Sequence, residues 1–235
     1  NNLRSLKVKT LLGKSSTSFS KLNFKKWMLV NLKVNRLPAM HIVDRYLKSI
    51  SHLNIYNDLK GLDFFIDKKD DVDLSVFPDK FKSGYVALVI GANHATKKMP
   101  STKLAEIVKT LNYPTLILGG PGDREEGELI ANHNSDFAIN TCGNFSINQS
   151  ASLIKQAEVV ITHDTGLMHI AAAYHKKIVS LWGNTVPEFG MTPYMPQYPG
   201  NSEVIEVKNL SCRPCSKIGY KECPKQHFNC MNHIK

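Results

Sequence analysis

A cluster of ionisable and small residues follows the β-branched run at residues 159–162. Asp164, Thr165 and Gly166 come first, and His169 follows Gly166 by about one helical turn. The amino end of a helix presents free N–H groups and a partial positive charge, and glycine lets a ligand approach closely. The pattern predicts a site for an anionic, hydroxyl-bearing ligand, in which Asp164 accepts hydrogen bonds from hydroxyls. A helix cap at Asp164 and a satisfied, half-buried His169 are the structural alternatives.

Two more charged residues, Lys97 and Glu125, follow earlier apolar runs at 85–90 and 115–118. Lys97 would supply a compact cation for a phosphate, and Glu125 would accept hydrogen bonds from sugar hydroxyls. Loops that follow consecutive parallel strands lie at one edge of a sheet. We therefore expect these side chains, with the neighbouring Lys98 and with Thr185 after the run at 178–182, to converge with Asp164.

Apolar runs and helical periodicity alternate from residue 85 onward. Strands are predicted at 85–90, 115–118, 137–140, 159–162, 178–182 and 203–207, the last at a sheet edge. Helices are predicted from residue 101, at 151–157 and at 165–174, with capping boxes formed by Asp123 with Glu126 and by Ser146 with Gln149. This alternation predicts an α/β fold with a parallel sheet and right-handed crossovers.

The 235-residue chain can bury one full domain and part of another. We expect residues 1–83 to be the remainder of an amino-terminal domain and a linker, with a helix after Pro38. Residues 84–210 would form the regular α/β domain, and residues 211–235 a Cys-rich segment. Because the sequence starts at Asn1 without a methionine, we expect it to begin within a longer protein. No run reaches the roughly 18 apolar residues that a membrane-spanning helix requires.

Positive charge is concentrated at the start of the chain. The net charge is +10, and residues 1–43 hold nine of the 30 Lys and Arg residues and no Asp or Glu. Such a segment attracts polyanions, among them nucleic acid, anionic lipid headgroups and phosphorylated glycans. A solvated basic face is the structural alternative.

Four cysteines, Cys212, Cys215, Cys223 and Cys230, lie within nineteen residues near the end of the sequence. Thiolates at such spacing can bind zinc tetrahedrally, and a chain without a secretion signal favours reduced thiols. Structural zinc, reduced packing cysteines and disulfides are the three interpretations. Cys142 stands alone and is expected in the core.

Four ordered motifs together carry a resemblance to a known family. They are Thr96-Lys97-Lys98-Met99-Pro100, Leu118-Gly119-Gly120-Pro121-Gly122-Asp123, Asp164-Thr165-Gly166-Leu167-Met168-His169, and Leu181-Trp182-Gly183-Asn184-Thr185. In these motifs and their order the chain resembles glycosyltransferase family 9, the ADP-heptose:lipopolysaccharide heptosyltransferases. The likeness is strong over about residues 85–190 and weaker at the start of the chain.

The resemblance implies a GT-B architecture, with one complete Rossmann-like carboxyl-terminal domain that binds the nucleotide-sugar donor and the tail of an amino-terminal one. It carries over six donor-binding residues, which are Lys97, Glu125, Asp164, Thr165, Gly166 and His169. The lysine would neutralise the donor diphosphate, the glutamate would bind donor hydroxyls, and the Thr-Gly pair would cradle the phosphates. The aspartate would orient the heptose, and the histidine would complete the wall of the donor site on the heptose side. Catalysis would need no metal or other cofactor.

The resemblance also implies a reaction and a location. A heptose, or a related sugar, would pass from an ADP-sugar to an anionic inner-core lipopolysaccharide precursor, in a cytoplasmic enzyme that is peripheral on the inner membrane. Attraction of the basic segment to that surface is worth roughly 1 kcal/mol per nearby Lys or Arg. The family's general base, an Asp, is expected upstream of Asn1, so no catalytic residue is assigned.

Three alternatives stay open at this point: a transferase that uses another nucleotide sugar, an inactive binding-only relative, and a nucleic-acid-binding protein with a basic arm and a zinc knuckle. The last belongs to a different class. It is disfavoured because the basic arm and the cysteines lie at opposite ends of a nearly charge-neutral region, and no nucleic-acid partner is expected.

Overall fold

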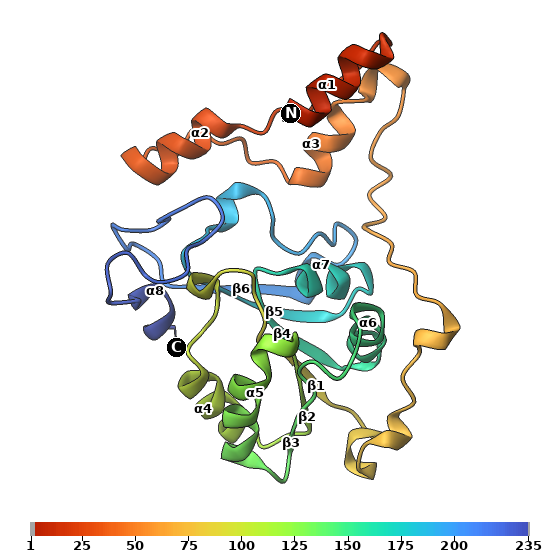
Figure 1. The fold of residues 1–235 in the computed structure, drawn as a ribbon, viewed down its shortest axis with the longest axis vertical. Helices are drawn as coiled ribbons and strands as arrows, with labels where there is room; N and C mark the ends of the chain where they lie inside the picture. Colours follow the sequence, from red (N-terminus) through yellow and green to blue (C-terminus); the bar gives the residue numbers. More distant parts are fainter. Residues whose placement is uncertain (1–2, 235) are drawn as a thin grey trace.

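A parallel six-stranded sheet lies at the centre of the computed structural model, which describes residues 3–234 (Figure 1). The strands are β1 (Val86–Val89), β2 (Thr115–Leu118), β3 (Ala138–Asn140), β4 (Val159–His163), β5 (Lys177–Trp182) and β6 (Ser202–Glu206). Their order is β3-β2-β1-β4-β5-β6, and every neighbouring pair is parallel. All six predicted strands are confirmed, including the edge position of β6. The order reverses between β1 and β4, where doubly wound sheets bind ligands.

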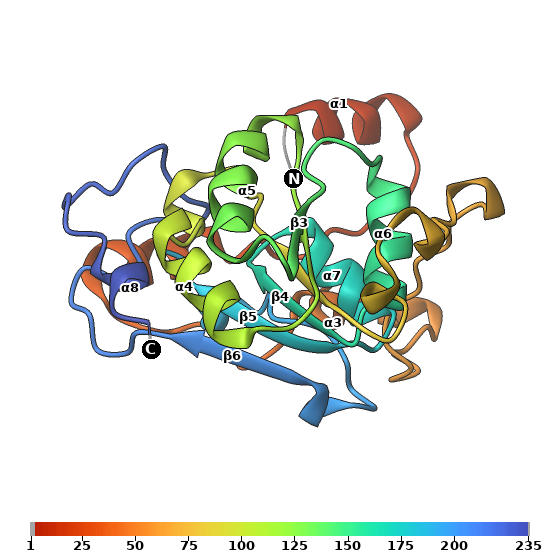
Figure 2. The ribbon, with the colours of Figure 1, turned by 90° about the horizontal axis from the view of Figure 1, so that it is seen from below.

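Two pairs of helices cover the two faces of the sheet (Figure 2). The first pair is α4 (Ser101–Leu111) and α5 (Arg124–Ala131), and the second pair is α6 (Ile147–Gln156) and α7 (Gly166–Ala173). Side chains alternate along each strand, so Val86 and Leu88 pack with α4 and α5, while Ala87 and Val89 pack with α6 and α7. The predicted α/β fold is confirmed.

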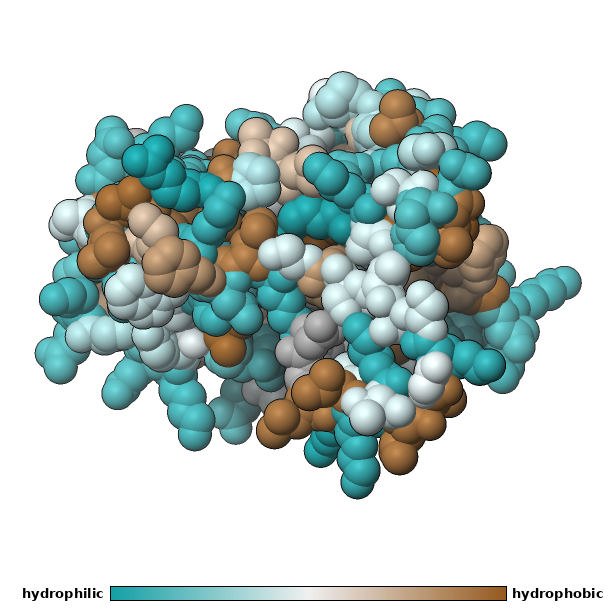
Figure 3. Space-filling model, turned by 90° about the horizontal axis from the view of Figure 1, so that it is seen from above, coloured by the Kyte–Doolittle hydropathy of each residue, from teal (hydrophilic) through white to brown (hydrophobic). Residues whose placement is uncertain are grey.

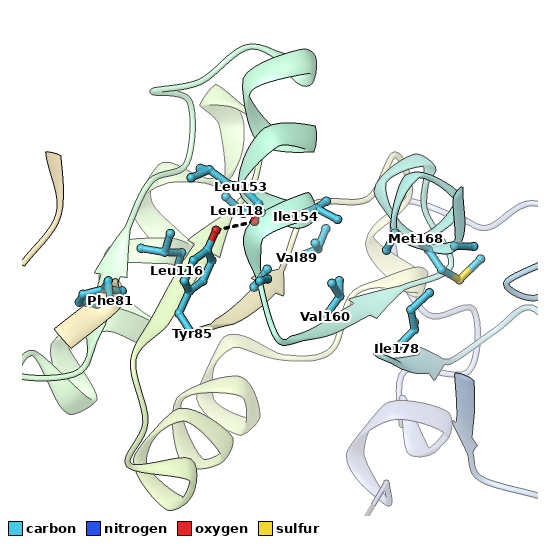
Figure 4. Close-up of a cluster of buried hydrophobic side chains, with 14 of the residues drawn as sticks. Phe81, Tyr85, Val89, Leu116, Leu118, Leu153, Ile154, Val160, Met168 and Ile178 are labelled. Carbon is cyan, nitrogen blue, oxygen red and sulfur yellow. Dashed lines mark hydrogen bonds between the residues drawn. The ribbon is translucent and has the colours of Figure 1, made fainter. Parts of the chain in front are cut away.

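The core on the α6 and α7 side includes part of the expected linker (Figure 4). The Tyr85 hydroxyl donates a hydrogen bond to the Leu153 carbonyl, and Phe81 is 1% exposed beside Leu116. Burying a phenylalanine contributes on the order of 2–3 kcal/mol. Phe81 therefore anchors the end of the expected linker in the core of the α/β domain.

The amino-terminal helices lie over the carboxyl edge of the sheet, at the top of Figure 1. They are α1 (Leu3–Leu12), α2 (Asn23–Trp27), which continues into a π-helical turn (Met28–Leu32), and α3 (Ile42–Lys48), the helix predicted after Pro38. The Ile42 N–H donates to the Gly190 carbonyl at 2.8 Å, and Leu29 packs against Val186 and Phe189. These contacts hold residues 23–48 against the loops that follow β5.

One of the two predicted capping boxes forms. Ser146 and Gln149 cap α6 reciprocally as predicted. The prediction for Asp123 with Glu126 is wrong, because a 3-10 turn at Pro121–Asp123 makes Asp123 the third residue of a turn, and its carboxylate accepts from the Gly120 N–H at 2.8 Å. Proline at the first position of the turn fixes this register.

The Cys-rich segment ends in the short helix α8 (Asn229–Asn232), which packs on the domain. Cys230, Met231 and Ile234 belong to the core on the α4 and α5 side. Across residues 3–234, no helix has the length and apolar character needed to cross a bilayer.

Candidate functional site

Three loops at the carboxyl edge of the sheet bring a lysine, an aspartate and a threonine together. Lys97 ends a 3-10 turn after β1, Asp164 follows β4, and Thr185 follows β5. The Lys97 Nζ lies 2.6 Å from the Asp164 Oδ2, which also accepts from the Thr185 Oγ1 at 3.0 Å. The predicted convergence of Lys97, Asp164 and Thr185 is therefore present.

The Lys97–Asp164 ion pair is largely shielded from water, and the Lys97 ammonium can still donate one further hydrogen bond. The two side chains are 17% and 8% exposed, so the attraction is screened less than in a surface pair. Lys97 also donates to the Asp164 main-chain oxygen at 3.3 Å. Because an ammonium has three N–H donors, Lys97 retains one for an incoming anion.

The amino end of α7 begins two residues after Asp164 and faces open space. Thr165 is an extended N-cap residue, and no side chain caps the first amides of the helix. A Cβ placed on the exposed Gly166 would meet no atom within 4 Å. These N–H groups have no intrahelical acceptor and can bind an anion that stands in front of the helix.

His169 lies at the same site, one turn into α7 and half-buried. Burial lowers its pKa, the Asp164 carboxylate opposes this shift, and the Lys97 ammonium adds to it. His169 is therefore neutral near pH 7 and can exchange hydrogen bonds with a ligand without adding charge.

A second histidine, His41, approaches from the amino-terminal segment, and sequence reasoning missed it. Burial is the main cause of its lowered pKa, and His169 contributes to the shift. The His41 Nε2 lies 2.9 Å from the Thr192 carbonyl, and its Nδ1 accepts from the Val43 N–H at 3.2 Å. This pattern fixes the proton on Nε2. No local motif could have indicated a contact across about 150 positions of sequence.

Lys98 and Glu125 lie outside this convergence. Lys98 bonds to Asp123 at 2.9 Å and to Glu126, and these partners outweigh burial, so its pKa is raised. Lys98 therefore ties the β1 loop to the start of α5. Glu125 is exposed in the first turn of α5, and its side chain makes no hydrogen bond or ion pair with any of residues 3–234. Its donor-binding role stays a prediction.

His163, the last residue of β4, is a further functional candidate that sequence reasoning missed. Its side chain is fully buried, and its Nε2 accepts the Met99 N–H at 2.9 Å. The proton therefore sits on Nδ1, which finds no acceptor among the described atoms. The hydrogen bond holds the Lys97 loop against β4. The sequence feature that could have indicated this residue is the position of a polar side chain, His163, directly after the β-branched run 159–162.

We expect His163 to make the protein less stable in acid. Burial lowers its pKa from 6.5 to about 4, so below pH 6.5 the unfolded chain binds more protons than the folded chain. Its contribution is fully present above pH 6.5 and is lost as the pH falls toward 4, about 3 kcal/mol in all. Urea unfolding at pH 7 and pH 4.5 should show a smaller pH dependence for His163→Gln, and equal dependence in both proteins would contradict this role.

The cysteines near the end of the chain are thiols in this structure, and Cys142 is buried as predicted. Burial, with the charges of the neighbouring thiols, raises the pKa of Cys215 to about 11 and that of Cys230 to about 12. Within the described part of the chain, no three or more His, Cys, Asp or Glu side chains are grouped to hold a metal ion. The zinc hypothesis for Cys212, Cys215, Cys223 and Cys230 stays a prediction.

Relatives of this chain share its sequence over part of its length. It is 32% identical over 121 residues to lipooligosaccharide heptosyltransferase 2 of Haemophilus influenzae, a match that covers 50% of this chain and 34% of that protein. It is 33% identical over 100 residues to lipopolysaccharide heptosyltransferase 2 of Escherichia coli, a match that covers 40% of this chain and 29% of that protein. The matches span about a third of the length of these curated relatives.

Two solved structures share the fold. E. coli ADP-heptose lipopolysaccharide heptosyltransferase II superposes with a TM-score of 0.56 at 19% identity, covering 83% of this chain and 61% of that chain. A glycosyltransferase family 9 protein of Veillonella parvula superposes with a TM-score of 0.60 at 22% identity, covering 74% of this chain and 51% of that chain. A model of glycosyltransferase family 9 (heptosyltransferase) matches residues 8–226. With its parallel α/β domain of GT-B type, the chain belongs to glycosyltransferase family 9.

Proposed function

We propose that this chain carries the donor-binding half of a glycosyltransferase that moves a heptose from an ADP-sugar to a lipopolysaccharide acceptor. Family membership supports the reaction class, and the curated relatives are named as heptosyltransferases of lipopolysaccharide or lipooligosaccharide. A solved E. coli heptosyltransferase of the same fold, with a TM-score of 0.54, holds ADP.

One observation carries the proposal: a spare lysine N–H and the open amino end of a helix flank the same aspartate. In the proposed complex the diphosphate lies across Lys97 and the Thr165 and Gly166 amides. Negative charge grows on the diphosphate as the sugar leaves. Fixed cations and N–H dipoles that already face this charge stabilise the transition state without reorganisation. Protein groups thus take the role that a divalent ion would otherwise fill.

Asp164 and His169 form the sugar side of the proposed site. When Lys97 engages a phosphate, Thr185 still holds the Asp164 Oδ2, so the carboxylate keeps its orientation toward sugar hydroxyls. His169, neutral because of its lowered pKa, can donate to or accept from those hydroxyls without repelling Lys97. The general base stays unassigned among the residues of this chain.

Calorimetric titration of the chain with ADP and UDP tests the proposal. We expect saturable ADP binding and at least tenfold weaker UDP binding, because the relative solved with its ligand holds an adenine nucleotide. Equal affinity for both would replace the ADP-sugar with another nucleotide sugar. Absence of binding to either nucleotide would contradict a donor site at this edge of the sheet.

The acceptor and the membrane surface belong to the proposal as partners. On the face seen in Figure 3, hydrophobic patches lie among hydrophilic side chains. Among the described residues of α1, Leu3 and Leu11 are 84% and 75% exposed beside basic neighbours. Peripheral binding to an anionic membrane stays a prediction. Family membership favours the transferase over the nucleic-acid-binding alternative.

A further inference from the structure

The carboxyl-terminal segment, residues 211–234, contacts both loops that carry the proposed donor site. It contains no helix or strand before α8. On the β1 side, the Tyr220 N–H donates to the Thr96 Oγ1 at 2.8 Å, and the Thr96 N–H donates to the Tyr220 carbonyl at 3.2 Å. Thr96 precedes Lys97, so this exchange fixes the backbone that carries the lysine.

On the β5 side, Arg213 is the main contact. Its Nε donates to the Gly183 carbonyl at 2.5 Å and its Nη2 to the Thr185 carbonyl at 2.8 Å. Its Nη1 donates to the Val207 carbonyl at 3.1 Å, and its Nη2 lies 2.7 Å from the Glu206 Oε2. The Arg213 side chain is 6% exposed, and its guanidinium N–H groups bond to three main-chain carbonyls and to the Glu206 carboxylate.

The two loops also touch each other directly. A Cβ on Gly183 would stand 2.9 Å from the Thr96 carbonyl, closer than real Cβ contacts. The Asn184 Nδ2 donates to the Ser216 Oγ at 3.1 Å. A shift of the β5 loop would therefore be passed to the β1 loop and to the segment that backs both.

We propose that Arg213 is a positioning residue of the donor site, an inference that rests on the proposed function. It holds the Thr185 backbone, Thr185 Oγ1 holds the Asp164 carboxylate, and Asp164 holds Lys97. Each step is a hydrogen bond or ion pair with little or no exposure. Loss of the guanidinium leaves three main-chain carbonyls and the Glu206 carboxylate without their partner, and the Thr185 loop loses its register.

The chain offers a matched control in Lys33. Its Nζ donates to the Cys212 carbonyl at 3.1 Å and to the Pro214 carbonyl at 2.8 Å, on either side of Arg213. Lys33 thus anchors the same segment from the amino-terminal side, and it makes no hydrogen bond to residues 183–185. A purely structural role of the segment predicts similar effects of the two residues on ADP binding.

The experiment measures ADP affinity by calorimetry and the thermal unfolding midpoint for the whole chain and for Arg213→Gln, Arg213→Lys and Lys33→Gln. We expect Arg213→Gln to weaken ADP binding at least tenfold, and Lys33→Gln, which removes a more exposed anchor of the same segment, to weaken it less than threefold. Arg213→Lys keeps the charge opposite Glu206 and is expected to lie between them. If Arg213→Gln does not fold, the ADP affinities of Arg213→Lys and Lys33→Gln are compared instead, and Arg213→Lys is expected to bind ADP more weakly.

A double-mutant cycle with Thr185→Val separates positioning from general stability. If Arg213 acts through Thr185, Arg213→Gln should cost less than threefold in affinity when Thr185 is already valine. Full additivity, or equal losses for Arg213→Gln and Lys33→Gln, would overturn the inference while leaving the proposed function intact. A wild-type chain that binds no ADP would instead refute the proposed function, and the inference with it.

Discussion

Replacing Gly166 by valine is expected to abolish ADP binding and to leave the fold intact. A Cβ at this position meets no atom within 4 Å outside its own helix turn and chain neighbours, so there is space for a side chain here. It would occupy the space in front of α7 where the phosphates are proposed to lie, and would keep them from the helix amides. We expect at least a 100-fold loss of ADP affinity by calorimetry, with the thermal unfolding midpoint nearly unchanged.

Gly200→Val provides the matched control for this experiment. A Cβ on Gly200 would also meet no atom within 4 Å, but this glycine lies in the 3-10 turn Pro199–Asn201 that precedes β6, at the opposite edge of the sheet. The Gly200→Val variant should bind ADP as the unaltered chain does. If Gly166→Val does so too, the phosphates do not stand before α7.

Lys97→Met is expected to weaken ADP binding by roughly 10- to 100-fold, the value of one charge-assisted hydrogen bond of about 1.5–3 kcal/mol. The substitution removes the phosphate partner and also uncovers the Asp164 carboxylate, which would then repel the diphosphate. Calorimetry at two salt concentrations measures the effect. The difference between the two proteins should shrink at high salt because the lost interaction is between charges.

The adjacent lysine serves as the control for charge. Lys98→Met removes the same charge one residue away, but that ammonium is bound to Asp123 and Glu126. We expect it to lower stability and to change ADP affinity by less than threefold. Equal losses of affinity for the two variants would mean that net charge, and not a specific contact of Lys97, attracts the nucleotide.

The fold and part of the site could be predicted because local patterns specify them. Short β-branched runs such as 159–162 are typical of a buried strand, and their alternation with amphipathic helices favours parallel pairing. Once the strands are parallel, the loops after β1 and β4 share an edge, which made the observed approach of Lys97 to Asp164 predictable.

The remaining features depend on contacts that no local pattern encodes. Residue type does not distinguish the neighbouring lysines at 97 and 98. Lys98 forms ion pairs with Asp123 and Glu126 because the start of α5 lies beside it. Arg213 lies in a segment without periodicity, and its two carbonyl acceptors in the β5 loop, at Gly183 and Thr185, are about 30 positions away. His41 meets its partner across a still longer separation.

In the proposed complex one diphosphate lies against the amino end of α7 beside Lys97. Amide NMR of the nitrogen-15-labelled chain during an ADP titration tests it most directly. We expect the Thr165, Gly166 and Leu167 amides to shift most, to saturate with the calorimetric affinity, and to lose these shifts in Lys97→Met. Saturable ADP binding that leaves these three amides unmoved and shifts residues elsewhere on the sheet would contradict it.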